Sequence, residues 1–262
     1  MEGDKIVARR GFSRKLVRGL RALSTNPLGM ARLLWEIVGV YVFGMPVAVF
    51  IRLLKPLVVV RFGRIDCTRL GHFIGMCEIY SCKRSRGAFR GYRDLLYTTG
   101  VPMNRYLWGL YNRQLRFSGW MRFPDIANRR LPGGERHVAP ITSVNLEGVY
   151  EQTSPSIALD EAERRAGDAW LQSVGVDTGR PLVLFANRDP AFLQKIDPDR
   201  DWSYHDCRDS SVANMLPMAR AMVAKGYAAI RMGSDVVEAL DVPEPMIIDY
   251  ASRARSEVLD IY

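Results

Sequence analysis

The longest apolar run in the chain lies near the N-terminus. The 19 residues from Leu33 to Ile51 contain one charge, Glu36. A helix needs about 20 apolar residues to cross the hydrocarbon core of a bilayer, so this run has marginal length for a span. Basic residues flank both ends of the run, so charge asymmetry selects no orientation across a membrane. The Gly-Met-Pro sequence at 44–46 would permit a break in the helix. We expect a monotopic or re-entrant helix; a membrane span and a buried core helix are the alternatives.

The segment before this run, residues 1–26, is basic and amphipathic. Apolar side chains recur at helical spacing from Phe12 to Leu23, with basic side chains between them. Asn26 ends the pattern, because the residue before a proline avoids the α region. We therefore predict that residues 1–55 form a membrane-associating segment that binds an anionic lipid surface. An ordinary solvated helix is the alternative.

Beyond residue 56 the apolar positions gather in short β-branched runs, separated by stretches of helical periodicity. Strands are expected at 57–60, 181–186, 227–232 and 246–248, and helices from about 71 and over 105–115, 159–174 and 212–225. Strands that alternate with helices indicate parallel sheets. We predict an α/β protein with two Rossmann-like lobes, over 56–158 and 159–262. The second lobe is expected to be incomplete, because three strands are few for a doubly wound domain.

Charge divides the chain into a basic and an acidic half. Residues 1–136 carry 25 Lys and Arg against 8 Asp and Glu, whereas residues 137–262 carry 12 against 20. The basic half therefore calls for an anionic partner, which could be lipid, nucleic acid or a phosphorylated substrate. The four cysteines are too few and too dispersed for a disulfide-stapled secreted module, so we expect reduced thiols.

Two arrangements in the sequence imitate metal sites. Cys67, His72, Cys77 and Cys82 follow one another at five-residue steps. Zinc ligands are usually closer together, and on a helix a five-residue step turns the side chains away from each other. The acidic run at 197–201 lacks the glycine and distal glutamate of a calcium loop. No metal or other cofactor is expected.

A nucleic-acid surface is the rival explanation for the basic half. Arginines and aromatic residues are interleaved at Arg84, Arg86, Phe89, Arg90, Tyr92, Arg93 and Tyr97. Such a set could bind phosphates and stack on bases. No signature of a known nucleic-acid module accompanies it. Lipid explains the charge with fewer assumptions, because the basic residues begin beside the apolar run, and no nucleic-acid partner is expected.

Several stretches within residues 57–262 together carry a family resemblance. They are 69–72, 104–113, 187–192, 204–210 with Asn214, 225–233, and 248–251 with 259–262. In combination they resemble a family of bacterial proteins regarded as glycosyltransferases and encoded with surface-polysaccharide biosynthesis genes. The resemblance implies a two-lobed, GT-B-like enzyme with a fucosyltransferase-like donor lobe. The first lobe would bind the acceptor and the second the nucleotide sugar.

The resemblance also implies a reaction and a place in the cell. A sugar would move from a nucleotide-sugar donor to a cell-surface glycan or lipid-linked acceptor, at the cytoplasmic face of the inner membrane or in the cytoplasm. In the family the donor lobe continues beyond the equivalent of Tyr262. A shortened, catalytically inactive membrane-associated α/β protein is therefore an alternative, and a basic nucleic-acid-binding protein is a second one.

The donor diphosphate would need positive charge near the carboxyl ends of the strands. Arg188 follows one predicted strand, Arg231 lies near the end of the next, and Arg208 lies in the loop between them. Gly233 would let the backbone approach the ligand, and Ser210 or Ser211 could cap the following helix. Asp189, His205 and Asp249 are predicted to support this site. The alternative is that Arg188–Asp189 and Arg208–Asp209 are local ion pairs.

The catalytic base is expected in the first lobe. His72 follows the loop after the first strand, and Asp66 lies near it in sequence. We predict these two as catalytic residues and Arg64, Arg69 and Gly71 as acceptor-side residues. His137 lies in a Gly- and Pro-rich stretch and is interpreted as structural.

Overall fold

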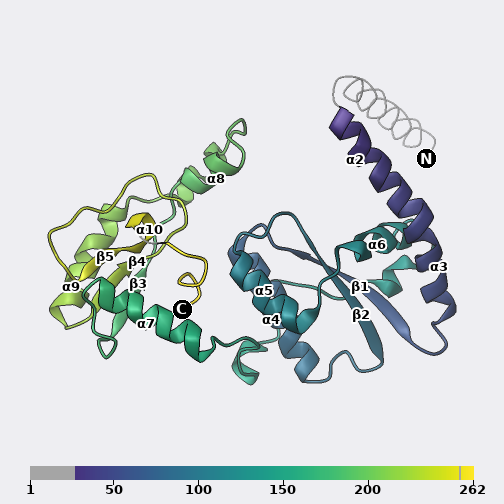
Figure 1. Ribbon diagram of the computed structural model, residues 1–262, viewed down its shortest axis with the longest axis horizontal. Helices are drawn as coiled ribbons and strands as arrows, with labels where there is room; N and C mark the ends of the chain where they lie inside the picture. The colour runs from purple at the N-terminus through teal and green to yellow at the C-terminus, as the bar shows by residue number, and fades with distance from the viewer. Residues whose placement is uncertain (1–26, 254) are drawn as a thin grey trace. The chain divides into compact units, whose positions relative to one another are not determined.

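The computed structural model describes residues 27–253 and 255–262 (Figure 1). The chain forms two compact units. Among the described residues, unit 1 comprises 27–103 and 111–156, and unit 2 comprises 104–110, 157–253 and 255–262. The boundary passes through helix α5 (Arg105–Leu115), whose first residues belong to unit 2. The amphipathic pattern predicted for residues 1–26 lies outside the described residues.

The apolar run forms one continuous helical rod. Helix α2 (Pro27–Val38) passes through a π-helical segment (Gly39–Gly44) into α3 (Met45–Leu53). Residues Leu28–Leu53 are long and apolar enough to cross a membrane by length and composition alone. Pro46 has no N–H to donate to the preceding turn, and the wider π turn lies just before it. The Gly-Met-Pro stretch therefore continues the helix and does not reverse it.

The second half of this rod packs on α6 (Arg122–Asn128) through small residues. A Cβ atom at Gly39 would lie 2.3 Å from the ring of Phe123, and one at Gly44 would lie 2.5 Å from the Phe123 carbonyl oxygen. Val40, Ala48, Phe123 and Ala127 form a buried cluster there. The two glycines thus let the helix backbones approach closely.

Unit 1 is built around a short parallel sheet. Strands β1 (Val59–Asp66) and β2 (Tyr92–Thr99) are connected by helix α4 (Leu70–Ser85). The 3-10 turns of unit 1 lie at Gly119–Met121, Gly134–His137 and Tyr150–Gln152. Phe62 on β1 is fully buried, and α3 covers this end of the sheet through Ile51. The helices predicted from about residue 71 and over 105–115 are confirmed. The strand predicted at 57–60 lies at Val59–Asp66, and β2 was not predicted.

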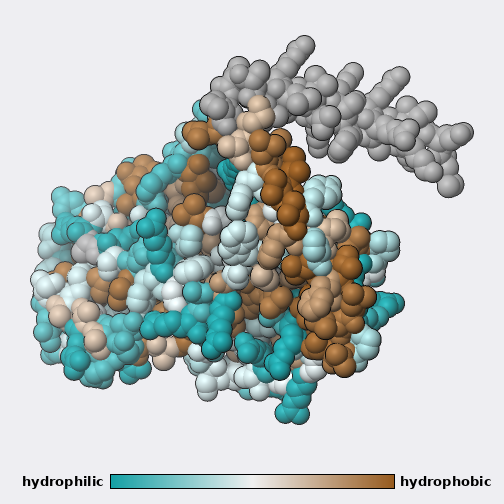
Figure 2. All heavy atoms as spheres, turned by 45° about the vertical axis from the view of Figure 1, so that its right-hand side comes forward, coloured by the Kyte–Doolittle hydropathy of each residue, from teal (hydrophilic) through white to brown (hydrophobic). Residues whose placement is uncertain are grey.

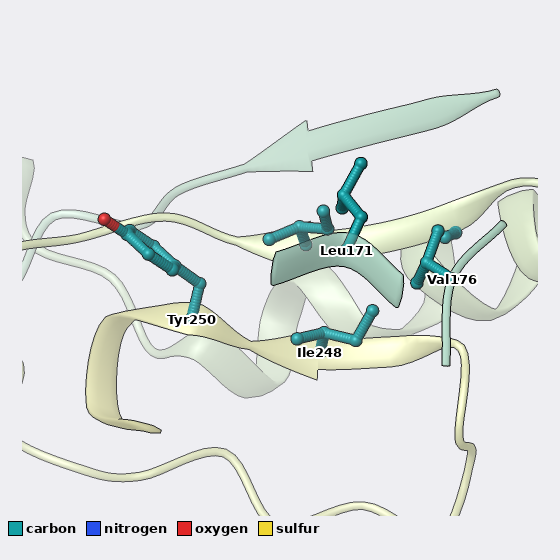
Figure 3. Packing of buried hydrophobic residues seen from close by; sticks show 6 residues of the cluster. Leu171, Val176, Ile248 and Tyr250 are labelled. Atoms are coloured by element: carbon teal, nitrogen blue, oxygen red, sulfur yellow. The ribbon is translucent and has the colours of Figure 1, made fainter. Parts of the chain in front are cut away.

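Unit 2 contains a three-stranded parallel sheet in the order β3 (Leu182–Phe185), β4 (Ala228–Arg231), β5 (Ile247–Asp249). Helix α7 (Glu161–Ser173) packs on one face, where Leu171, Val176, Ile248 and Tyr250 form the core (Figure 3). A capping box of Asp160 and Glu163 begins α7.

Helix α9 (Leu216–Ala224) packs on the other face of this sheet, with Ala219 and Ala229 buried between helix and strand. The remaining helical pieces are α8 (Ala191–Ile196), the 3-10 turns Ser203–Arg208 and Val212–Met215, and α10 (Tyr250–Arg253). The predicted α/β class is therefore confirmed. An apolar N-terminal helix is followed along the chain by parallel strands that alternate with helices. The two-lobed glycosyltransferase architecture stays a prediction.

Candidate functional site

The carboxyl ends of the unit 2 strands lie in register. Phe185 is paired with Arg231, and Arg231 with Asp249, at the last position of each strand. In parallel α/β sheets, ligands bind in the crevice outside this edge. A hollow of about 360 Å³ opens there. Its polar lining consists of Asn187, Asp189, Asp209, Ser210, Ser211, Arg231 and Glu238.

Arg231 is buried at the base of the hollow, with 1% of its surface exposed. Its Nη1 donates to the Glu238 carbonyl oxygen at 2.6 Å and lies 3.6 Å from Oδ2 of Asp249. Its Nη2 is 3.4 Å from Oδ1 of Asn187, and its Nε has no hydrogen-bond partner in the part of the chain that the structure describes. The guanidinium therefore connects β4 to the loops after β3 and β4. Its Nε–H is left as an unused donor.

Asp249 is held by the loops around it. Its Oδ2 accepts hydrogen bonds from the backbone of Leu240 and the hydroxyl of Ser252, each at 2.6 Å. With Arg231 it forms an ion pair whose two side chains are each 1% exposed. A buried charge needs a partner. Asp249 thus neutralises Arg231 and holds it in position, and its role in a donor site stays a prediction.

Arg188 lies at the rim and has a different partner from the one its sequence neighbour suggests. Its Nε is 3.3 Å from Oδ1 of Asp209, which lines the hollow, so the local Arg188–Asp189 pair considered as the alternative does not form. Asp189 instead accepts from the backbone of Ala191 and Val237, at 3.0 and 3.2 Å. Asp189 therefore connects two loops that shape the hollow.

The other predicted donor-side residues lie away from this lining. Arg208 is exposed on the 3-10 turn before the hollow. His205 is half-buried against Tyr204, at a ring distance of 4.1 Å. A Cβ atom at Gly233 would meet Val236 and Ala251, so its close approach is to protein. Ser211 caps the turn at 212, as predicted, through the backbone N–H of Ala213.

The charges of the hollow differ from those expected of a diphosphate site. Among its lining residues, the carboxylates of Asp189, Asp209 and Glu238 outnumber the one guanidinium, that of Arg231. The structure brings Arg188 and Arg231 to one sheet edge, each beside an aspartate, and leaves Arg208 apart. Carboxylates, an amide and hydroxyl groups suit a ligand rich in hydroxyl groups better than a bare polyanion.

The residues predicted as catalytic and acceptor-side lie near the carboxyl end of β1. Asp66 ends the strand, and its Oδ1 accepts from the backbone N–H and the hydroxyl of Thr68 at 2.9 and 2.7 Å. Burial alone would raise the pKa of Asp66, but these hydrogen bonds and the charges of Arg69 and His72 lower it overall. A carboxylate with a lowered pKa is a weak base, so Asp66 stabilises the turn that begins α4.

His72 lies exposed in the first turn of α4. Arg64, Arg69 and Gly71 are likewise exposed at this end of the unit 1 sheet. His137 is buried, and its Nδ1 lies 2.6 Å from the carbonyl oxygen of Val60, in agreement with its structural interpretation. Among the described residues, no group of three or more His, Cys, Asp and Glu side chains could hold a metal ion.

A second and larger hollow of about 930 Å³ lies in unit 1. We call it the arginine groove, because its lining includes Arg84, Arg90, Arg93, Arg113 and Arg116. The interleaved pattern at 84–97 indicated part of this surface. Sequence reasoning missed Arg113 and Arg116, which join it from the end of α5 and the loop after it. The sequence feature that could have indicated these two arginines is the excess of positive charge in this part of the chain.

The chain matches no family model, no curated protein and no solved structure.

Proposed function

We propose that this protein is a membrane-associated glycosyltransferase that takes its donor from a nucleotide sugar. The hollow at the carboxyl edge of β3, β4 and β5 carries this proposal. Its position is that of the ligand crevice in parallel α/β proteins, and its lining offers carboxylates, an amide and hydroxyl groups. Such groups bind the hydroxyls of a ribose or a hexose.

Each part of the hollow has a role in this proposal. Asp189, Asp209 and Glu238 accept hydrogen bonds from sugar or ribose hydroxyls, while Arg188 at the rim supplies positive charge for the diphosphate. Arg231 holds the loops in place. Glycosyl transfer requires that the negative charge of the leaving diphosphate be stabilised. It also requires that a base remove the proton of the acceptor hydroxyl. His72 stays the predicted base.

The N-terminal helix supports association with a membrane. Among its outward side chains, Leu34, Trp35, Tyr41, Val42 and Phe50 are more than half exposed. Figure 2 shows apolar side chains gathered over this part of unit 1. An apolar surface of this extent marks a membrane or a partner.

The contacts of the helix favour a position in the plane of the membrane. Glu36 pairs with Arg122, and Arg52 donates to Oδ1 of Asn128 at 2.8 Å, so the helix is docked on unit 1 from residue 36 to residue 52. A span would draw these polar groups and the buried Asp125 into hydrocarbon, where charged side chains are costly even when they are paired. The helix would instead lie with its outer face in the interface.

Titration of the purified full chain with uridine, guanosine, cytidine and thymidine nucleotide sugars tests the donor site. We expect heat of binding with one of them, and about tenfold weaker binding in Glu238→Ala, because a hydrogen bond to a charged group is lost. Asp199→Ala removes a carboxylate from an exposed loop outside the hollow and should bind as the wild type does.

Absence of heat with every nucleotide sugar would contradict the donor site. It would favour the alternative of a membrane-associated α/β protein without transferase activity. Equal weakening in Glu238→Ala and Asp199→Ala would show that binding depends on general charge and would remove the hollow from the proposal.

A further inference from the structure

Four arginines of the arginine groove carry a positive charge that no ion pair among the described residues neutralises. Arg84, Arg90, Arg93 and Arg116 are exposed, and none of the ion pairs within the described residues includes them. The groove's single lining carboxylate is Asp94, which already serves Arg61 through two hydrogen bonds of 2.7 Å. A ligand with more than one negative charge would therefore find guanidinium donors without competing carboxylates.

Several contacts hold together the strands beneath the groove. Arg61 and Asp94 face each other on β1 and β2, and Tyr80 from α4 donates to Oδ2 of Asp94 at 2.8 Å. The guanidinium of Arg61 also lies 3.8 Å from the ring centre of Tyr92. These contacts fix the strand from which Arg93 projects, so less ordering is required when a ligand binds.

Apolar residues line part of the groove near α3. Leu57, Val58, Leu95 and Met121 line it, and the last three pack with Ile51 of α3. Leu57 is 85% exposed and follows α3 directly. Trp120, next to Met121, contacts Trp35 and Phe43 of the helical rod at ring distances of 5.7 Å. The groove thus runs from a charged part to the apolar surface that the proposed function places in the membrane.

The aromatic rings of the groove are engaged within the protein. Phe89 stacks on Tyr80 at 5.0 Å, and one face of Tyr92 is covered by Arg61. Tyr97, the third aromatic residue of the interleaved pattern, does not line the groove; it is buried and donates to Asp125 at 2.7 Å. Base stacking on single-stranded nucleic acid needs open ring faces. These contacts favour a phosphate ligand without bases.

We propose that the arginine groove binds the diphosphate head of a membrane lipid whose hydrocarbon chain leaves past Leu57 into the bilayer. The volume of the groove is in the range of small-ligand sites. The several guanidinium groups match a head with two or more charges better than the single charge of a phosphodiester lipid. The proposal rests on the membrane association proposed above and names the acceptor as a lipid-linked diphosphate.

Vesicle binding by the purified full chain, without any nucleotide sugar, tests this site. The probes are phosphatidylcholine vesicles with a small fraction of polyprenyl diphosphate, and vesicles with phosphatidylglycerol at equal surface charge. We expect tighter binding to the diphosphate vesicles, reduced about a hundredfold in Arg93→Gln/Arg116→Gln, because about tenfold is lost with each charged hydrogen bond. The matched control Arg86→Gln/Arg136→Gln removes equal charge from exposed positions outside the groove and should bind like the wild type.

Three results would overturn the proposal. Equal binding to both kinds of vesicle would indicate general surface electrostatics, and equal losses in the groove and control variants would indicate the same. Inorganic pyrophosphate that binds as tightly as the lipid would assign the groove to a soluble phosphate. Should Arg93→Gln/Arg116→Gln fail to fold, Arg84→Gln/Arg90→Gln must show the same loss. Donor binding in unit 2 is measured separately, so failure of either proposal leaves the other testable.

Discussion

Arg61 and Asp94 form a two-pronged ion pair between directly opposed positions of β1 and β2, with 9% and 3% of their side chains exposed. Two hydrogen bonds of 2.7 Å join them. The pair satisfies charges that would otherwise be buried unpaired, and it connects the strands beneath the arginine groove.

Removal of one member of this pair should destabilise the protein strongly. Asp94→Ala leaves a buried guanidinium without its counter-charge, so we expect the free energy of unfolding to fall by about 3–5 kcal/mol. Urea denaturation of the protein, followed by its fluorescence, measures the loss of unfolding free energy. The double variant Arg61→Met/Asp94→Leu should recover most of it, and a double variant as unstable as Asp94→Ala would show that the charges themselves are required.

The arginines of unit 2 should differ in their effect on stability. Arg231 is paired within the core, whereas the Arg188–Asp209 pair is partly exposed. We expect Arg231→Met to lower the free energy of unfolding by about 3–5 kcal/mol, and Arg188→Ala by about 1 kcal/mol or less. Chemical denaturation of both variants gives the comparison. Equal losses would contradict the burial argument, and Arg188→Ala is therefore the better variant for binding studies.

The close contact between Gly44 and α6 should tolerate no side chain. A Cβ at Gly44 would press on the backbone of Phe123, which cannot move aside as a flexible side chain can. We expect Gly44→Ala to lower the free energy of unfolding by about 1–3 kcal/mol. Gly109→Ala is the control, because a Cβ there would meet nothing within 4 Å. Thermal unfolding in detergent measures both, and equal midpoints would exclude tight docking of the helix.

The outward face of the helix should set the affinity for membranes. Phe50 is 59% exposed, and its replacement by serine removes apolar area without disturbing the docked face. We expect Phe50→Ser to weaken partition into anionic vesicles by about ten- to a hundredfold, because about 1.5–3 kcal/mol of apolar transfer is lost. Val144→Ser, at an exposed apolar position elsewhere in unit 1, should have little effect. Vesicle sedimentation distinguishes the two; the same partition for Phe50→Ser and wild type would argue against insertion.

The charge of Asp66 should make stability depend on pH on the acid side. Because folding lowers the pKa of Asp66, its ionised form stabilises the native state above the unfolded pKa of about 4. That contribution is lost as the pH falls through the lower folded pKa. The stability difference between wild type and Asp66→Asn should therefore be constant near neutral pH and shrink below about pH 4. Urea midpoints across this range measure it, and Thr68→Val, which removes one hydrogen bond to Asp66, should show a smaller pH effect.

Periodicity along the chain was sufficient to predict the α/β class, the apolar helix and helix α5 at its observed bounds. Helical and strand patterns arise from backbone hydrogen bonds and burial over a few neighbouring residues, which the amino-acid order expresses directly. The helix predicted at 159–174 is likewise found over Glu161–Ser173. The sequence also predicts an anionic partner for the basic half, because net charge can be counted without a fold, and this stays a prediction.

Tertiary structure alone decided which charges meet. Arg188 pairs with Asp209 and not with its neighbour Asp189, and Arg231 is neutralised by Asp249 on the next strand. Arg116 reaches the groove that Arg93 lines, although the two are far apart in sequence. Ion pairing depends on strand register and on how loops fold back over a sheet edge. Those relations bring distant residues together, and no local periodicity encodes them.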